Sequence, residues 1–400
     1  MKSYKVKKLK YLLPLLIVSP NLFAEVCIIA NGQDASTVIQ ACIDNAIENS
    51  TVEIPVGTYL FQKEVIVHKA LTITTEGKLI GDSSCHRNTQ SCTELKAGRR
   101  AAIFDGLFQL NASGIVFRHL RINGNQDVRK KAIKNICKDT HRTGMNISVN
   151  NHFITVTKIA SYDNPCGSNL EIRKVDGSTL GVQITENNIV NSGKHDTQWS
   201  DGIGFHGAED SIISGNNIQN ATDIGLIFGH CINCEVSNNI ISNLTDNLRG
   251  SFGGILVYSW EKDGNNNGGD YTSTIFKNNV IRGGKKNSMG FGILVGGRAW
   301  EVGKIIKNVT LDGNKIINAQ HALVIDSSAR NIIVKNQSIK VNWSVKDKFS
   351  ATCNDKLIRG TKYLVSPEAT NVSAENTVEG YGVRIGSKWD ISCIPNVYRK

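Results

Sequence analysis

A repeated six-residue pattern in the middle of the chain restricts the fold more than any other feature of the sequence. Three segments, 184–189, 213–218 and 235–240, end in two asparagines and an isoleucine. Their last isoleucines are 29 and 22 residues apart, and a glycine-containing aliphatic strand follows each segment, at 202–205, 225–228 and 254–257. Short alternating strands that repeat at such a period are typical of a β-solenoid.

Asparagine suits the turns of a solenoid for two physical reasons. Its side chain bonds its own backbone at a turn and tolerates a left-handed conformation. Stacked Asn side chains also bond from coil to coil, which satisfies polar groups that are buried there. The alternative is an ordinary β-sandwich with Asn-rich turns, which gives no reason for the recurring register.

Composition and charge agree with an exported repeat protein. A length of 400 residues suggests several globular domains, but a single solenoid can grow indefinitely because each coil contacts only its neighbours. Residues 1–24 resemble a signal peptide, with five lysines, an apolar run at 11–18 that is too short to span a membrane, and Ala24 before the expected cut. Without this segment the formal charge of +11 falls to about +6, a mild bias toward anionic partners. We expect a secreted or periplasmic protein with no nucleic-acid partner and no membrane contact after signal removal.

Ten cysteines, an even number in a chain expected to be exported, predict disulfide bonds. Their spacings suggest local pairs, although sequence alone leaves the connectivity open: Cys27 with Cys42, Cys85 with Cys92, Cys137 with Cys166, Cys231 with Cys234, and Cys353 with Cys393. The Cys231–Cys234 spacing also fits a redox dithiol or half of a zinc site.

The N-terminal end of the solenoid requires a cap, because an open coil would expose its core. Residues 34–50 have a helical pattern whose apolar face is made by Val38, Ile39, Cys42, Ala46 and Ile47. Extended segments are expected to follow at 52–59, 71–73 and 79–81.

Two of these segments carry a family resemblance. Residues 38–44 read Val-Ile-Gln-Ala-Cys-Ile-Asp, and residues 52–59 read Val-Glu-Ile-Pro-Val-Gly-Thr-Tyr. They resemble the opening of the pectin-lyase-like right-handed parallel β-helix proteins, Ala-Ile-Gln-x-Ala-Ile-Asp and then Val-x-Ile-Pro-x-Gly-x-Tyr. The resemblance implies an all-β, right-handed parallel β-helix with a short N-terminal capping helix over residues 25–342, and we expect a C-terminal cap over 343–400. The superfamily includes lyases, hydrolases, epimerases and tailspike proteins, so the reaction stays open.

Two charged segments each allow two interpretations. Residues 127–143 are basic and fit a surface loop or a clamp for a polyanion. Residues 263–270 are acidic and fit a flexible turn or a calcium loop, although the terminal Glu of an EF-hand is missing.

Functional residues should lie on an outer face, because the inward side chains of a parallel β-helix pack into a solid core. In the resembling family, substrates lie along the first strand of each coil, which here is the glycine-aliphatic ladder. Alternation from inward Ile203 and Phe205 points His206, Tyr258 and Arg298 outward and His230 inward.

Asp201 and Asp223 are the principal catalytic candidates. They fall at nearly the same place on adjacent coils, which lie roughly 5 Å apart. Two carboxylates that close raise one pKa, giving an acid and a base together. Residues 200–203 resemble the Thr-Asp-Gly-Ile element of polygalacturonase-type glycoside hydrolases, and 222–226 fall where that family has Asp-Asp-Cys-Ile. Ile224 replaces the second Asp, Phe252 stands near the place of a Gly-His-Gly histidine, and no Arg-Ile-Lys element follows. Turn capping through Asx bonds is the alternative role for both aspartates.

A lyase or C5-epimerase on uronic acid polymers is the competing enzymatic hypothesis. It needs a cation beside the substrate carboxylate and a base that removes the proton. Candidates are Lys194, His195, His206, Tyr258 and Arg298, and a calcium ion would have Asp196, Asp201 or Asp223 as ligands. We expect no required cofactor for hydrolysis, and Ca²⁺ only for a lyase.

The sequence therefore predicts a carbohydrate-active enzyme that cleaves or modifies a neutral or acidic polysaccharide, with hydrolysis favoured. Its catalytic candidates are Asp201, Asp223, His195, His206, Tyr258 and Arg298. Its substrate-binding candidates are Trp199, Trp260, Trp300, Lys194 and Arg249, where the tryptophans either stack on sugar rings or seal loops. A non-catalytic glycan-binding solenoid is the alternative from another class, and a monomer is expected.

Overall fold

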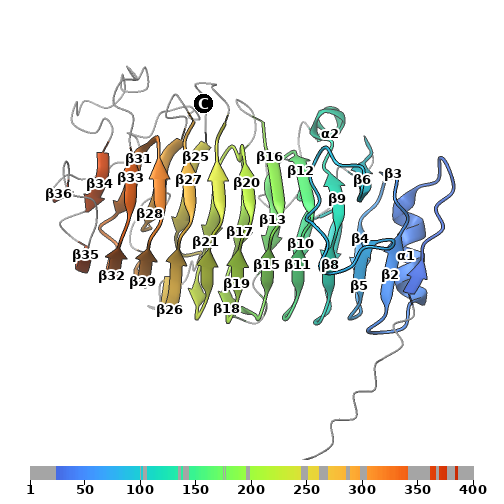
Figure 1. Cartoon of the computed structure of the whole chain (residues 1–400), viewed down its shortest axis with the longest axis horizontal. Coiled ribbons are helices and arrows are strands. Elements are labelled where there is room, and N and C mark those ends of the chain that lie inside the picture. The colour runs from blue at the N-terminus through green and yellow to red at the C-terminus, as the bar shows by residue number, and fades with distance from the viewer. Residues whose placement is uncertain are drawn as a thin grey trace, which may run out of the picture.

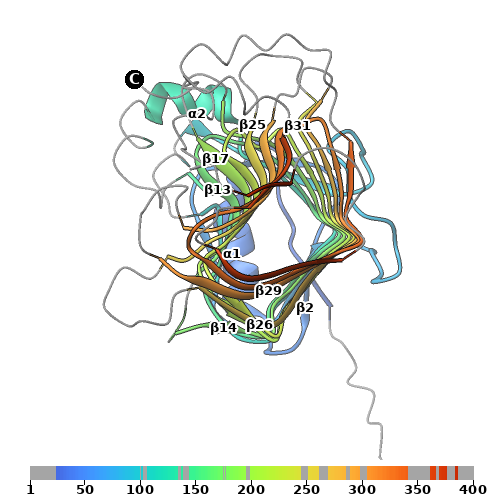
Figure 2. The ribbon, with the colours of Figure 1, turned by 90° about the vertical axis from the view of Figure 1, so that its left-hand side faces the viewer.

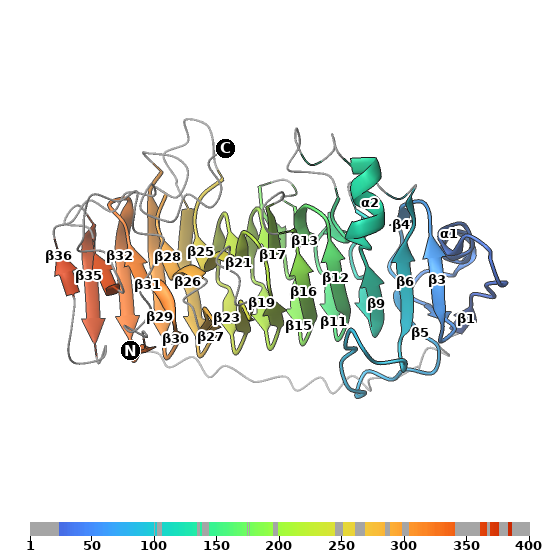
Figure 3. The same ribbon diagram turned by 90° about the horizontal axis from the view of Figure 1, so that it is seen from above.

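The strands of this chain stack into a long three-sided coil. The computed structural model describes residues 24–99, 101, 106–133, 137, 144–173, 175, 177–194, 199–244, 251–260, 269–284, 289–297, 304–340, 361–365, 369–375 and 383–385. Successive strands along the chain belong to three long sheets in turn, and neighbouring strands within a sheet run parallel. Figure 2 shows the three sides end-on, and Figures 1 and 3 show the row of coils from two directions. The fold is a right-handed parallel β-helix, as the sequence predicts.

The three long sheets and one short sheet contain the following strands. The 11-stranded sheet has β4 (Val65–Val67), β7 (Phe108–Leu110), β10 (Ile147–Val149), β13 (Gly167–Ile172), β17 (Ser200–Phe205), β21 (Ile224–Phe228), β25 (Ser251–Val257), β28 (Met289–Val295), β31 (Ala319–Ile325), β34 (Thr361–Val365) and β36 (Val383–Ile385). The 12-stranded sheet has β1 (Ala24–Val26), β2 (Thr51–Ile54), β5 (Thr72–Thr75), β8 (Val116–Arg118), β11 (Thr155–Thr157), β15 (Gln183–Thr185), β19 (Ile212–Ser214), β23 (Glu235–Ser237), β26 (Gly269–Lys277), β29 (Ile306–Asp312), β32 (Ala329–Lys335) and β35 (Thr370–Glu375). The 10-stranded sheet has β3 (Thr58–Phe61), β6 (Thr93–Ala97), β9 (Leu120–Asn123), β12 (Ala160–Asn164), β16 (Asn188–Ser192), β20 (Asn217–Gln219), β24 (Ile240–Ser242), β27 (Val280–Arg282), β30 (Lys315–Ile317) and β33 (Ser338–Lys340). The short sheet has β14 (Thr179–Leu180), β18 (Ala208–Glu209) and β22 (Cys231–Ile232).

The core is built from aliphatic and aromatic side chains that stack in register from coil to coil. On the 11-stranded sheet one inward row passes through Leu170, Ile203, Leu226 and Ile255, and all four are fully buried. Phe205 and Phe228 stack in the next row, with ring centroids 4.7 Å apart and planes 7° apart. Burial of such apolar surface is the main favourable term in folding.

A ladder of asparagines runs through the turns between the 12-stranded and the 10-stranded sheets. Its members are Asn187, Asn216, Asn239, Asn279 and Asn314, and all are 0–1% exposed. From Asn187 to Asn279, each amide Nδ2 donates to the Oδ1 of the next ladder residue and to a main-chain carbonyl, while the Oδ1 accepts a main-chain N–H. These contacts satisfy amides that would otherwise be buried without partners.

The observed register shifts the third repeat by one residue from the alignment that the sequence predicts. Ile213 pairs with Val236 and Ile218 pairs with Ile241, so the second interval between coils is 23 residues and not 22. The reason is the direction of the side chain, because Ile241 is 2% exposed in the core while Ile240 is 40% exposed. The left-handed backbone also falls one place earlier than expected, on Glu186, Gly215 and Asn238, and not on the ladder asparagines.

The N-terminal end of the solenoid is covered by α1 (Ala35–Asn45). The side chain of Asp34 caps this helix by accepting a hydrogen bond from the Ser36 N–H. Ile39, Cys42 and Ile43 face the core. Two expectations about this region are wrong. Ile47 lies beyond the end of the helix and is 69% exposed, and residues 79–81 form no strand because Leu79 and Ile80 point to solvent at 70% exposure each.

The basic segment expected as a loop contains a helix, α2 (Gln126–Ile133), which directly follows β9 (Figures 1 and 3). Arg129 on this helix is fully buried, unlike a residue of a solvated loop. Lys134, Lys138 and Arg142 lie outside the described residues, so the polyanion clamp stays a prediction. At the other end, β34, β35 and β36 continue the parallel pairing beyond residue 342, where we expected a separate cap to begin.

Four of the five suggested cysteine pairs are joined in the structure. They are Cys27–Cys42, Cys85–Cys92, Cys137–Cys166 and Cys231–Cys234. The bond between Cys231 and Cys234 excludes a zinc-ligand role for these thiols in this state. Cys353, Cys393 and residues 1–23 with the signal lie outside the described residues. In the part of the chain that the structure describes, no helix has the length and apolarity needed to cross a membrane.

Candidate active site

The candidate site lies on the outer face of the 11-stranded sheet, on the neighbouring strands β13, β17 and β21 (Figure 1). Asp201 is the second residue of β17, and Asp223 immediately precedes β21. The Asp223 N–H donates to the Ser200 carbonyl, which in a parallel pair places Asp223 beside Asp201, while the pairing of Ile203 with Leu226 leaves one extra residue on the strand of Asp223. The two aspartates therefore lie side by side on adjacent coils.

A row of glycines turns Asp201 to the outside of the sheet. A Cβ on Gly202 would lie 2.5 Å from Ile218 Cγ2 in the core, and a Cβ on Gly254 would lie 2.6 Å from Ile281 Cγ2. Gly202 therefore faces inward, as Ile203 does, and the alternation of side chains breaks between them. Simple alternation from Ile203 would place Asp201 in the core. Because alternation breaks at Gly202, the carboxylate of Asp201 lies on the outer face.

The Asp201 carboxylate is partly buried and is held by two hydrogen bonds. Its Oδ1 accepts the Ile224 N–H at 3.1 Å, and the Ser168 side chain on β13 also bonds it. Burial raises the pKa of Asp201 to about 7, and the negative charge of Glu171 adds to this, while the Ile224 N–H and His206 act in the opposite direction. At neutral pH this carboxyl is divided between its protonated and its ionised form.

Asp223 is the second perturbed carboxyl of the site. Its Oδ1 is buried and has no hydrogen-bond partner. Burial raises the pKa of Asp223 well above its ordinary value, and the charge of Asp201 raises it further. Because like charges this close cannot both ionise cheaply, the pair retains a proton to a higher pH than either carboxyl would alone.

Glu171 is the member of the site that the sequence did not reveal. It lies on β13 beside Gly204, is 3% exposed, and its Oε1 is 3.2 Å from His206 Nε2 and 3.4 Å from Arg173 Nε. Burial raises the pKa of Glu171, but the hydrogen bond and charge of His206 and the charge of Arg173 outweigh it, so its pKa lies below the ordinary value. The sequence did contain a signal for Glu171. It is a lone acidic residue between Leu170 and Ile172, and because these two point inward, alternation places Glu171 on the outer face.

His206 points outward as expected and its side chain is 41% exposed. Its ring stacks on Trp260 with centroids 5.4 Å apart and planes 20° apart. The Trp260 Nε1–H donates to the Phe205 carbonyl at 3.3 Å, so this tryptophan is anchored on the sheet and is only partly exposed. Trp199 is 37% exposed and meets Phe252 edge-on at 5.9 Å.

Tyr258 and His230 occupy special surroundings. Tyr258 lies on the outer side of the sheet as expected but is 1% exposed in an apolar cluster, so it is closed to solvent. Of the core and turn roles expected for His230, the structure shows the turn role: its Nε2 is 2.8 Å from Ser178 Oγ and 3.9 Å from Glu209 Oε1, at the turn toward β22. Lys194 is exposed, past the end of β16. His195, Asp196, Arg249, Arg298 and Trp300 lie outside the described residues.

The described residues offer no ready metal site. None of their His, Cys, Asp and Glu side chains gather in a group of three or more that would hold a metal ion. Of the suspected calcium loop only Gly269 and Asp270 are described. Asp270 Oδ1 accepts from the Thr272 N–H and hydroxyl, as an Asx cap does.

No protein-family model and no curated protein matches the sequence. Solved structures do match. The polygalacturonase from Erwinia carotovora ssp. carotovora has a TM-score of 0.56 at 11% identity, with 97% of this chain and 100% of that chain covered. The endo-xylogalacturonan hydrolase from Aspergillus tubingensis has a TM-score of 0.55 at 11% identity, covering 92% and 100%. The alginate lyase from Paenibacillus sp. str. FPU-7 has a TM-score of 0.54 at 12% identity, covering 80% and 98%.

The chain shares the parallel β-helix fold of these proteins. At these identities the likeness concerns the fold alone, so the functional site is inferred from its own residues. The outer face of the 11-stranded sheet carries the perturbed carboxyls.

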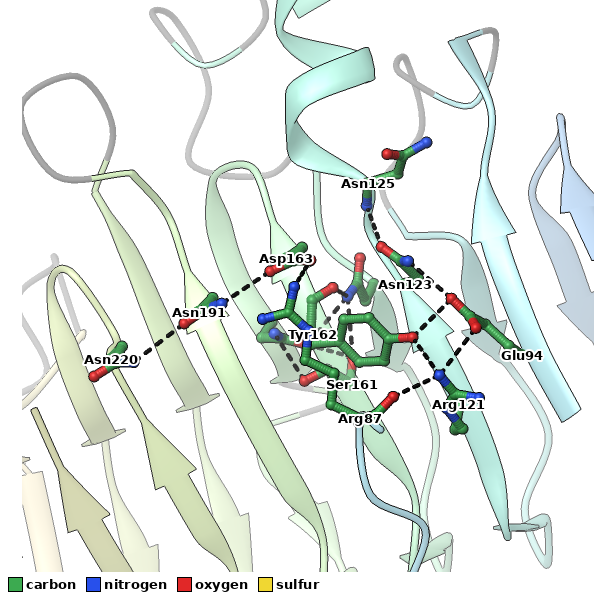
Figure 4. A network of polar contacts seen from close by, with 12 residues as sticks. Arg87, Glu94, Arg121, Asn123, Asn125, Ser161, Tyr162, Asp163, Asn191 and Asn220 are labelled. Carbon is green, nitrogen blue, oxygen red and sulfur yellow. Dashed lines mark hydrogen bonds and ion pairs between the residues drawn. The ribbon is translucent and has the colours of Figure 1, made fainter. Parts of the chain in front are cut away.

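A second polar cluster lies on the outer face of the 10-stranded sheet (Figure 4). Arg121 pairs with Glu94 at 2.9 Å and Arg87 pairs with Asp163 at 2.8 Å. Burial raises the pKa of Glu94, but hydrogen bonds, one of them from Tyr162, and the charge of Arg121 outweigh it and lower the pKa. These charged groups are paired with opposite charges, in contrast to Asp201 and Asp223. The cluster therefore stabilises the sheet surface, and we assign it no catalytic role.

Proposed function

We propose that this protein is an exported glycoside hydrolase that cleaves a polysaccharide, with Asp223 as general acid and Asp201 as general base. The observation that carries the proposal is the pair of carboxyls on adjacent coils, both with raised pKa and one with a buried, unpartnered oxygen. Strongly perturbed pairs of this kind cluster at catalytic sites. The activities named for the polygalacturonase and the xylogalacturonan hydrolase of the same fold support the substrate class.

We assign the two roles from the two pKa shifts. Asp223, whose pKa burial raises well above its ordinary value, donates its proton to the glycosidic oxygen as the bond breaks. Asp201 in its ionised form removes a proton from the attacking water. The fixed negative charge of Glu171 keeps the pKa of Asp201 high, and His206 and Arg173 hold Glu171 in place.

Turn capping explains other aspartates of this chain better than it explains this pair. Asp34, Asp270 and Asp326 each accept the N–H and the hydroxyl of a Ser or Thr two residues later. Asp223 Oδ1 has no hydrogen-bond partner, and burial raises the pKa of this carboxyl, which disfavours the ionised form that a cap needs. A cap would be expected to lower the pKa, as it does for Asp270.

Lyase or epimerase chemistry on uronic acid polymers is the second candidate function. The observation that favours it is His206, which is exposed beside the aspartates and is oriented by Glu171 as a base would be. In that reaction a calcium ion, or a cationic side chain of this chain, would neutralise the substrate carboxylate. A glycan-binding role without catalysis is the remaining alternative.

The test is a panel of neutral and uronic acid polysaccharides, followed in parallel for reducing ends and for absorbance near 235 nm. We expect reducing ends without absorbance. Rising absorbance would mean β-elimination with His206 as the base, and an epimerase would change the sugar composition without either signal. Binding without any chemical change on the panel would replace the enzyme with a glycan-binding solenoid.

The rate should depend on pH through the two aspartates. Because the pKa of Asp201 is raised to about 7, we expect the rate to rise with pH as this base ionises, with its half-maximum near pH 7 and not near pH 4. Glu171→Gln removes a charge that raises this pKa, so the acidic limb of the profile should move to lower pH. A wild-type limb near pH 4, or an unmoved limb in the variant, would assign the base to another group.

A further inference from the structure

The corner between the 11-stranded and the 12-stranded sheets has a left-handed residue in each of several consecutive coils. This conformation brings the Cβ close to the following carbonyl oxygen, and Gly, Asn and Asp are the residues that tolerate it routinely. The coils on either side of Phe153 follow this rule, with positive φ at Gly114, Gly181, Asp210 and Asn233. Phe153 occupies the same position with a φ of 53°. A bulky side chain at positive φ is an outlier that costs conformational energy.

The Phe153 ring gains little burial in return for this cost. It packs on Gly181 of the next coil, where a Cβ would lie 2.5 Å from Phe153 Cδ1, so glycine is required there. His152 accepts the Leu180 N–H at 3.0 Å and meets the ring only at a centroid distance of 6.3 Å. Phe153 is therefore 59% exposed, and packing within the chain does not account for an aromatic side chain at this corner.

Two polar side chains stand beside the exposed ring. Gln183 follows Gly181 by two residues and is exposed, and its side-chain amide makes no hydrogen bond to the described residues. Asp210 is the corner residue of the next coil and is also exposed. Its Oδ1 accepts from Asn233 Nδ2 at 2.6 Å, which orients the carboxylate and leaves Oδ2 for a ligand. Amide and carboxylate groups can donate to and accept from sugar hydroxyls.

We infer that this corner binds a neutral sugar residue of a polysaccharide, at a place separate from the aspartate pair. The sugar lies with its C–H groups on the Phe153 ring, whose face carries partial negative charge. Its hydroxyls bond the amide of Gln183 and the carboxylate of Asp210. Coils lie about 4.8 Å apart, so a sugar placed over Gly181 reaches Asp210 on the next coil.

The carboxylate of Asp210 decides between neutral and acidic sugars. A uronic acid would bring a second carboxylate to this place, and like charges repel. β18 lies between Asp210 and β17, the strand that carries Asp201. The corner therefore holds a part of the polymer that is not being cleaved, and the inference does not depend on which reaction the aspartates perform.

The experiment is affinity electrophoresis of the full chain in gels that contain xylan, dextran, polygalacturonate or alginate. The Asp201→Asn/Asp223→Asn double variant serves as the background, so that no polymer is cleaved during the run. We expect retardation by xylan or dextran, the neutral polymers. Phe153→Asn and Asp210→Ala should each weaken this binding by about tenfold or more. Retardation only by polygalacturonate or alginate, or by none of the four, would overturn the inference.

Phe153→Asn separates binding from folding. It places at the corner a residue type that tolerates the left-handed conformation, so the melting temperature should stay close to that of the background protein. Leu79→Ala is the matched control, because it removes another apolar side chain, 70% exposed, that lies outside this corner. Equal retardation of Phe153→Asn and Leu79→Ala would remove the ring from the site. A clear fall in the melting temperature of Phe153→Asn, with the binding of Asp210→Ala unchanged, would give the ring a structural role and overturn the inference.

Discussion

Asp223→Asn is expected to lower the rate of polysaccharide cleavage by about 10²–10⁴-fold while the protein stays folded. The amide cannot supply the proton that Asp223 donates in the proposed mechanism, and it leaves the main-chain bonds of residue 223 to Ser200 and Gly253 unchanged. The measurement is the initial rate of reducing-end release at saturating substrate.

Asp201→Asn should cause a loss of similar size, and the double variant should lose little more, because an acid and a base that act in one step are not additive. The matched control is Asp270→Asn, the same chemical change at a turn cap on the 12-stranded sheet. Its rate should equal that of the wild type. Undiminished reducing-end release by Asp223→Asn would remove Asp223 from the mechanism.

The second large effect concerns stability and the asparagine ladder. Asn239→Ala should lower the free energy of unfolding by at least about 3 kcal/mol, because it leaves the Asn216 amide, the Asn216 N–H and the Ile213 carbonyl buried without this partner. Asn217→Ala, next to the ladder but partly exposed, should cost less than about 1 kcal/mol. Thermal unfolding of both variants is the measurement, and equal melting temperatures would show that the ladder contributes nothing specific.

Sequence reasoning was sufficient for the fold because the solenoid repeats its constraints. The Asn-Asn-Ile pattern marks a turn that recurs in the central coils, and the glycines mark places where an isoleucine of the 10-stranded sheet approaches too closely for a Cβ. The register of the third repeat was off by one because both Ile240 and Ile241 fit the pattern. Only packing distinguishes the buried isoleucine from the exposed one.

The sequence predicted only part of the site, for physical reasons that differ from residue to residue. Asp201 and Asp223 were visible as two acids at similar places on adjacent coils. Glu171 was not, because it stands in a coil without the repeat motif and its role arises from contacts with His206 and Arg173. Tyr258 was placed on the correct side of its strand, but alternation says nothing about what covers that side, and the tyrosine is buried.

The fold holds Asp201 and Asp223 in a desolvated pair with raised pKa values. Such a pair makes the folded state bind more protons than the unfolded state between about pH 4 and pH 7, since the pKa of Asp201 is 3.8 when unperturbed and about 7 in the fold. Stability contributed by the pair is therefore present below pH 4 and is lost as the pH rises through this window. Replacing both carboxyls by amides removes that loss.

The most direct measurement is the melting temperature of the wild type and of the Asp201→Asn/Asp223→Asn double variant at pH 3 and pH 8. We predict nearly equal values at pH 3 and a clearly higher value for the double variant at pH 8, by at least about 1 kcal/mol in free energy of unfolding. A double variant that is less stable than the wild type at pH 8 would show that the aspartates stabilise the fold as ordinary ionised caps, and it would contradict the account.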